Sequence, residues 1–102
     1  MILYEKTPAV DQDWKEIANY TLNNYGEKQL LQYTSNLTKC LEDMAKGKGY
    51  YKDIKVQKNL IRVKHCQKHY KFALIRKDKP MLIIAIFHER MDLIQRVKKR
   101  LK

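Results

Sequence analysis

Apolar residues recur at helical spacing through the first half of the chain. Thr7-Pro8 is typical of a helix start, because a hydroxyl can cap the helix and proline suits its first position. Apolar residues then follow at intervals of three and four, first over residues 10–21 and then over residues 30–44. A glycine follows each stretch, as expected of a helix end. The pattern predicts two long helices that form an antiparallel hairpin.

The period of the pattern changes to two in the second half of the chain. Residues 46–55 contain two glycines and are predicted to form a loop. Residues 60–66 and 69–75 alternate apolar with polar side chains, which predicts two strands. The polar residues 76–80 have the length of a hairpin connection. Residues 81–87 are all apolar, as expected of a central strand that is covered on both faces.

Short elements at the two ends complete the prediction. Ile2 to Tyr4 is predicted to be a first strand, and Leu93 to Leu101 a terminal helix with Asp92 as its N-cap. The expected order is one strand, two helices, three strands and one helix. This order predicts an α+β fold with an antiparallel sheet, in a single domain over residues 1–102.

Charge is divided unevenly between the two halves of the chain. Residues 1–51 hold 6 Lys and Arg against 7 Asp and Glu, a balance of −1. Residues 52–102 hold 16 against 4, a balance of +12. A near-neutral scaffold joined to a strongly basic half favours an acidic partner, such as nucleic acid, a ribosome or an acidic protein. A basic coat that only serves solubility is the alternative.

Neither export nor membrane insertion is indicated. The longest apolar run is only residues 81–87, and the N-terminus lacks the layout of a secretory signal. The two cysteines, Cys40 and Cys66, have no metal-ligand spacing and do not indicate a disulfide framework. A reducing cytoplasm is therefore the expected location.

Two familiar catalytic arrangements are incomplete in this sequence. His88-Glu89 begins like the zinc-binding HExxH motif, but Asp92 stands where the second histidine is required. His65 and Cys66 are neighbours on a predicted strand, so their side chains point to opposite faces and form no catalytic pair. We therefore expect no metal and no cofactor.

Cations on a predicted sheet, followed by polar residues at a strand end, could support cleavage of RNA. A sheet cation can hold a phosphate, and a histidine or glutamate can exchange a proton with the 2′-hydroxyl. A solvated basic face gives the same pattern, so both interpretations stay open. Arg62 and Lys64 share one face of the same predicted strand. The candidate catalytic residues are Lys64, Lys71, His88, Glu89 and Arg90.

Three segments together resemble the RelE/ParE superfamily of bacterial type II toxins, and within it the ParE branch. Residues 7–33 are similar to the family's opening helix and helix junction, and residues 60–76 are similar to its paired strands. Residues 83–93 are the most specific segment. They resemble a last core strand that ends in a His-x-x-Met-Asp pattern, here from His88 to Asp92.

The resemblance implies a toxin that a cognate antitoxin holds inactive. Antitoxins of this type wrap an acidic, partly disordered segment around the toxin. The basic half of this chain gives such binding an electrostatic reason, and folding on binding is the expected mode. The resemblance therefore implies a hetero-oligomer of toxin and antitoxin.

Two activities compete within the superfamily. ParE-like toxins bind and poison DNA gyrase without chemistry of their own, and the segment that starts at His88 favours this activity. RelE-like toxins cut mRNA in the ribosomal A site with basic residues and commonly a C-terminal tyrosine. Lys64 matches one such lysine, but Lys71 stands where those sequences have an arginine with its bidentate grip on phosphate. No tyrosine follows Tyr70, although some ribosome-dependent relatives use a histidine near His88.

The predicted function is therefore inhibition of DNA gyrase by a ParE-like toxin, with an mRNA endonuclease as the alternative. A small basic nucleic-acid-binding module without toxic activity is a third interpretation. The cations expected to contact the target lie on the sheet, at the last strand's end and in the last helix. They are Arg62, Lys64, Lys71, Arg90, Arg96, Lys98, Lys99 and Arg100.

Overall fold

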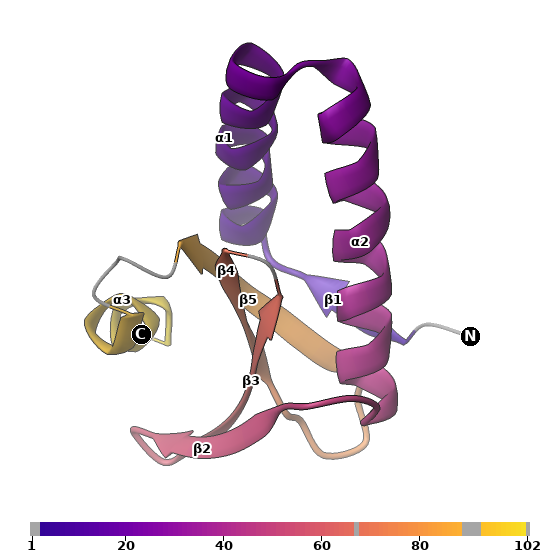
Figure 1. The fold of residues 1–102 in the computed structure, drawn as a ribbon. Helices are drawn as coiled ribbons and strands as arrows, with labels where there is room; N and C mark the ends of the chain where they lie inside the picture. Colours follow the sequence, from indigo (N-terminus) through magenta and orange to yellow (C-terminus); the bar gives the residue numbers. More distant parts are fainter. Residues whose placement is uncertain (1–2, 67, 89–92, 102) are drawn as a thin grey trace.

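Helices and strands follow each other in the predicted order, with one additional strand. The computed structural model describes residues 3–66, 68–88 and 93–101. Its elements are β1 (Tyr4–Lys6), α1 (Pro8–Tyr25), α2 (Glu27–Lys46), β2 (Lys52–Val56), β3 (Asn59–Cys66), β4 (His69–Leu74), β5 (Met81–His88) and α3 (Leu93–Arg100) (Figure 1). The predicted α+β fold is confirmed. Ile2 of the expected first strand and Asp92, the expected cap of α3, lie outside the described residues.

The two long helices begin and end where local chemistry favours it. Thr7 Oγ1 accepts a hydrogen bond of 3.3 Å from the Val10 amide, and Pro8 occupies the first turn of α1. Gly26 links the helices with a φ of 90°, and Gly47 ends α2 with a φ of 70°. Glycine adopts both values without strain. Because one residue separates the helices, α2 runs back beside α1 (Figure 1), and the predicted hairpin is confirmed.

The strands form a mixed sheet in the order β1-β5-β4-β3-β2. β1 pairs with β5 in parallel, whereas the other neighbouring strands pair antiparallel. The prediction of a wholly antiparallel sheet is therefore wrong at β1. The physical reason is the long crossover: the chain passes through the hairpin and three strands before β5 returns beside β1, as parallel pairing requires.

The loop predicted over residues 46–55 is wrong in part, because Lys52–Val56 forms β2. β2 pairs with β3 through a two-residue turn at Gln57 and Lys58, whose φ values are 50° and 72°. Turns of this kind generally use asparagine or glycine, which tolerate positive φ. Neither residue stands here, so the sequence carries no signal for this hairpin.

β5 is the central strand and is covered on both faces. Ile83 and Ile86 belong to the core under the helical hairpin, while Ile84 and Ala85 belong to the core under α3. The register with β4 shifts by one residue just after Phe72, so two consecutive β5 residues face the same side. The predicted central strand is confirmed. Within the described part of the chain, no helix has the length and apolar character needed to cross a membrane.

Two side chains form hydrogen bonds with backbone groups of β5 beyond the end of β1. β1 pairs with β5 only as far as Ile83. Past that point, the Ile86 amide donates to Asp13 Oδ2 over 3.1 Å. The Ile84 carbonyl accepts from Arg100 Nη1 over 2.8 Å. Arg100 also donates to both carboxylate oxygens of Asp13, at 2.9 and 3.0 Å, so an ion pair joins α1, β5 and α3.

The two cysteines form a disulfide, which the sequence does not predict. Cys40 of α2 is bonded to Cys66 at the end of β3, and their Cα atoms lie 6.7 Å apart. Cys40 is only 5% exposed and belongs to the buried part of α2. The expectation of unpaired cysteines fails because 26 residues separate the two in sequence. They meet only when α2 packs against the sheet.

Replacing Asp13 by asparagine is expected to destabilise the fold by about 2–3 kcal/mol, because Arg100 then lacks its counter-charge. This lies below the range of about 3–5 kcal/mol for fully buried pairs, since the Arg100 side chain is 25% exposed. Urea denaturation gives the free energy of unfolding. The matched control is Glu5→Gln, which breaks the surface pair with Arg76 and should cost less than about 1 kcal/mol. Equal losses in the two variants would contradict the central role of Asp13.

Candidate functional site

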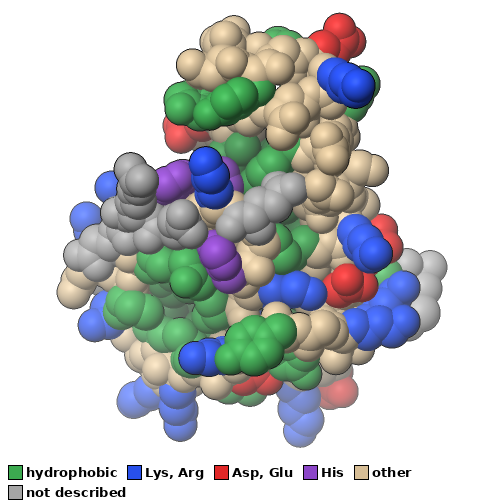
Figure 2. All heavy atoms as spheres, viewed as in Figure 1, with side chains coloured by type: hydrophobic (Ala, Val, Ile, Leu, Met, Phe, Trp, Pro, Cys, Tyr) green, Lys and Arg blue, Asp and Glu red, His purple; other side chains and the backbone are tan. Residues whose placement is uncertain are grey.

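A groove lies between the helical hairpin, the ends of β4 and β5, and α3. Its volume is about 900 Å³. Figure 2 shows histidine side chains in the space beneath the hairpin, with Lys and Arg side chains at its edges. Among the described residues, the tyrosines, lysine and arginines that line the groove come from all three helices and from the β3–β4 connection. They are Tyr20, Tyr25, Tyr33, Lys68, Arg96 and Arg100.

Tyrosines of the hairpin form an aromatic wall. Tyr20 and Tyr25 of α1 are 61% and 63% exposed, and their rings meet edge to face with centroids 6.3 Å apart. Next to them, Tyr33 of α2 stacks on Trp14 at a centroid distance of 5.8 Å. Exposed tyrosines present rigid, amphipathic area and are enriched at the hot spots of interfaces. This wall therefore suits a protein partner.

Histidines lie at the floor of the groove, where β4 begins and β5 ends. The Tyr33 hydroxyl and His69 Nδ1 are hydrogen-bonded at 2.8 Å. His69 is also the cross-strand partner of His88, with ring centroids 5.4 Å apart. Burial raises the pKa of Tyr33 to about 12, so this hydroxyl stays protonated near neutral pH. His88 ends the last strand as predicted.

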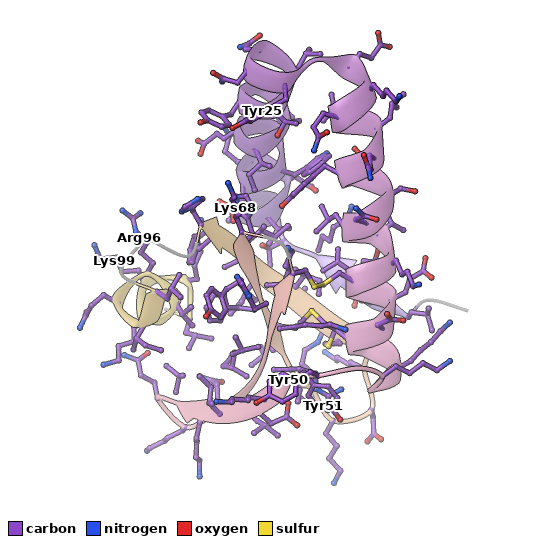
Figure 3. All side chains as sticks on the ribbon, viewed as in Figure 1. Tyr25, Tyr50, Tyr51, Lys68, Arg96 and Lys99 are labelled. Carbon is purple, nitrogen blue, oxygen red and sulfur yellow. A yellow bond between two sulfur atoms is a disulfide. The ribbon has the colours of Figure 1, made fainter. Side chains whose placement is uncertain are left out.

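Cations lie on the sheet side and the α3 side of the groove. Lys68 and Arg96 are exposed and come from separate elements on the same side of the molecule (Figure 3). Arg100, also predicted to contact the target, is instead held by Asp13 and lies over the Phe87 ring at 4.8 Å. Arg100 therefore fixes the shape of the groove, while Lys68 and Arg96 present their charges to its open side.

The predicted cations of β3 lie on the hairpin face of the sheet and are engaged there. Arg62 donates to both carboxylate oxygens of Asp53, at 2.9 and 3.1 Å, and to the Met44 carbonyl of α2 at 3.0 Å. The hydrogen bond to Asp53 raises the pKa of Arg62. Lys64 Nζ donates to the Lys48 carbonyl over 3.3 Å. These two cations hold α2 and the residues after it to the sheet.

Lys71, also predicted to contact the target, lies beside Lys64 on the sheet, but it is buried. The two lysines are cross-strand partners, and Lys71 is 1% exposed. Its Nζ donates to the carbonyls of Cys66 at 2.8 Å and His69 at 3.4 Å. The ring centroid of Tyr33 lies 5.9 Å from the same nitrogen. Burial lowers the pKa of Lys71 to about 8. The expectation of an open basic face is therefore wrong at Lys71, because α2 covers it.

The other predicted contact residues lie apart from the groove or beyond the described part of the chain. Glu89 and Arg90 lie outside the described residues. Lys98 is partly exposed and Lys99 is exposed on α3, but the described lining of the groove includes neither. Among the described residues, no group of three or more His, Cys, Asp or Glu side chains is placed to bind a metal ion.

Sequence reasoning misses the residues that give the groove its character. Tyr20 and Tyr25 lie outside the buried stripe of α1, and Lys68 lies in the short β3–β4 connection. The sequence nevertheless carries a signal. A tyrosine on the polar side of an amphipathic helix buries little apolar area when the chain folds, so folding alone does not explain its presence there. Exposed tyrosines of this kind indicate a contact surface, although the sequence does not show what lies opposite them.

Comparison with known proteins identifies one family. Residues 4–93 match the family model described as "ParE toxin of type II toxin-antitoxin system, parDE". Over 102 residues the chain is also 36% identical to the Escherichia coli protein named "Toxin ParE", covering 100% of this chain and 99% of that protein. The family match reaches the first residue of α3, Leu93, and the pairwise match includes the whole of that helix.

The buried Lys71 is expected to make stability rise with pH. Its pKa is about 8 in the fold against 10.5 without burial, so between these values the unfolded chain binds the extra proton. The free energy of unfolding should increase by about 2 kcal/mol from pH 8 to about pH 10, as urea denaturation can measure. Above that range the raised pKa of Tyr33 acts in the opposite direction.

Lys71→Met should remove most of this rise. Lys52→Met, which changes an exposed lysine of β2, is the control and should retain it. A Lys71→Met variant with the wild-type pH dependence would show that another group titrates.

Proposed function

Because the chain belongs to the ParE toxin family of type II toxin–antitoxin systems, we propose that it inhibits DNA gyrase by direct binding. In this proposal the protein acts in the cytoplasm, and a cognate antitoxin neutralises it by covering part of the same contact surface. The groove between α1 and α3 is that surface. In this proposal the protein carries out no catalytic step of its own.

The observation that carries the proposal is the composition of the groove. Its α1 wall offers two tyrosines that are more than half exposed, and its opposite side offers the exposed cations Lys68 and Arg96. Aromatic and arginine side chains are the usual energetic centres of protein interfaces. A volume of about 900 Å³ accommodates several side chains of a partner.

Charge supports an acidic antitoxin as the second partner. The chain has a net charge of +11, and residues 52–102, which form β2 to β5 and α3, carry +12 against −1 in residues 1–51. An acidic segment gains a faster association rate and correct orientation from such a field. A segment that folds on binding can also reach both the tyrosine wall and the cations, which come from different elements.

The candidate nuclease residues give weaker support to catalysis. Lys71 is 1% exposed, and Lys64 donates to a backbone carbonyl on the hairpin side of the sheet. Stabilisation of a developing phosphorane charge requires donors that face the reacting phosphate. Among the described residues, these two lysines lie beneath or beside α2 instead of in the groove. This arrangement favours inhibition by binding.

One observation favours the alternative, an mRNA endonuclease. His69 and His88 are adjacent at the groove floor, with ring centroids 5.4 Å apart. Exposed Lys68 precedes His69 in the sequence and lines the same groove. Two imidazoles can serve as general base and general acid near neutral pH, and the lysine can hold a phosphate. The third interpretation, a basic nucleic-acid-binding module, differs from both because it predicts no growth arrest.

Purified gyrase distinguishes the first two functions. The protein is expected to block negative supercoiling and to cause cleaved DNA to accumulate, while mRNA in the ribosomal A site remains intact. A molar excess of the cognate antitoxin should restore supercoiling. Cleavage of A-site mRNA with unaffected gyrase would overturn the proposal in favour of the endonuclease. Unimpaired growth on expression would leave the nucleic-acid-binding interpretation.

Variants of the groove test the proposed contact surface. Tyr20→Ala and Arg96→Ala should each weaken gyrase inhibition by about tenfold, because interface hot spots lose more than about 1 kcal/mol on truncation. Tyr50→Ala is the matched control, since Tyr50 is 80% exposed and lies outside the groove. Dose–response curves of supercoiling give the comparison, and circular dichroism confirms the fold.

Two outcomes of the variants would change the interpretation. An equal loss in the control variant would show that the groove is not the contact surface. Conversely, a triple alanine variant of Lys64, Lys71 and His88 that remains fully toxic would exclude the endonuclease.

A further inference from the structure

The Cys40–Cys66 disulfide connects α2, which lines the groove, to the end of β3, the strand that leads to the groove floor. Cys40 lies in α2, and Cys66 is the last residue of β3. Immediately after it, Lys68 and His69 line the groove, and Tyr33 of α2 lines it from the other element. The sulfur atoms lie between α2 and the strands (Figure 3). The bond therefore fixes the floor of the groove against the helix beside it.

A hydrogen bond provides a second tie, between α2 and the start of β4. The Tyr33 hydroxyl of α2 meets His69 Nδ1 at 2.8 Å. Within the β3–β4 hairpin, Lys71 Nζ donates to the Cys66 carbonyl at 2.8 Å and so braces the strand end that carries the sulfur. When the disulfide is absent, the position of the groove floor relative to α2 depends more on the Tyr33–His69 bond.

The two cysteines differ in exposure. Cys66 is partly exposed at the end of its strand, whereas Cys40 is 5% exposed within the core. Thiol–disulfide exchange proceeds by attack of a thiolate on one sulfur, and access decides which sulfur is attacked. A small thiol from solvent therefore reaches Cys66 first, and Cys40 is the leaving group.

We infer that Cys40 and Cys66 form a reversible oxidation site whose disulfide holds the groove in its partner-binding shape. The reactants are low-molecular-weight thiols and disulfides. The link to partner binding rests on the proposed function, whereas the redox chemistry does not. In a reducing compartment the pair is held as two thiols, and an oxidising shift converts it to the disulfide.

The oxidation is balanced with glutathione disulfide as the oxidant. The Cys66 thiolate attacks one glutathione sulfur, which forms a mixed disulfide and releases one glutathione thiolate. The Cys40 thiolate then attacks the Cys66 sulfur and expels the second glutathione thiolate. The two cysteines lose two protons and two electrons, and glutathione disulfide gains both as two glutathione molecules.

Redox titration tests the site itself. The purified full-length protein is equilibrated in glutathione buffers of graded ratio, quenched in acid, alkylated and weighed intact by mass spectrometry. We expect a transition from dithiol to disulfide within the range that glutathione covers. A bond that persists in native protein under excess reduced glutathione would overturn the inference and make the disulfide purely structural. Failure to oxidise under excess glutathione disulfide would also overturn it.

Hydrogen exchange tests the coupling to the groove floor. Amides of residues 68–71 should exchange about tenfold faster in the dithiol than in the disulfide form, while those of Ile83–Ile86 in the core should be unchanged. Tyr33→Phe removes the second tie, so it should increase this difference and have little effect on the oxidised protein. Identical exchange in both redox forms would show that the bond does not position the floor.

Supercoiling assays test the link to function. The disulfide form should inhibit gyrase at least about threefold more strongly than the dithiol form, because only the former holds the competent groove. Cys40→Ser/Cys66→Ser, which cannot oxidise, should match the dithiol form in every buffer. Equal inhibition by both forms would overturn the regulatory role. Inhibition by neither form would instead refute the proposed function. Mass spectrometry and hydrogen exchange would still test the redox site independently.

Discussion

The structure depends on which groups form hydrogen bonds with the backbone of β5 beyond the end of β1. The Ile86 amide and the Ile84 carbonyl lie in a buried strand, where a polar group without a partner costs about 1–3 kcal/mol. Asp13 and Arg100 supply these partners from α1 and α3. Since the two also bind each other, neither charge is buried alone. One ion pair thereby fixes two helices to opposite faces of the same strand.

The groove follows from the same constraint, because it occupies the edge that β1 leaves open. The Thr7 amide still donates to the Ile83 carbonyl at 3.2 Å, but Pro8 lacks an amide and begins α1 instead. Had β1 continued, a strand would lie where Asp13 now binds β5. A two-residue signal for helix initiation therefore also determines where the molecule is hollowed. The tyrosines of α1 and the cations of α3 face each other across this space.

The sequence predicts what depends on local pattern and misses what depends on packing. The hairpin and β5 are predicted because stripes, glycines and an unbroken apolar run carry their own signals. β2 is missed because Gln57 and Lys58 make its turn without glycine or asparagine. The alternation of β3 and β4 places Lys64 beside Lys71 but cannot show which side α2 covers. The disulfide and the tyrosine wall likewise arise only when distant segments meet.

The division of charge within the groove restricts how a partner can lie in it. Among the described lining residues, the acidic side chains are Asp13 and Glu16 of α1, and Asp13 is already neutralised by Arg100. Lys68 and Arg96 lie on the opposite side without an acidic neighbour among the described lining residues. In the proposed binding mode, an acidic and apolar segment therefore lies in one orientation, with its carboxylates toward β4 and α3 and its apolar side against the tyrosines of α1. The reverse orientation places like charges together at Glu16 and leaves Lys68 and Arg96 facing apolar groups, which electrostatic complementarity disfavours.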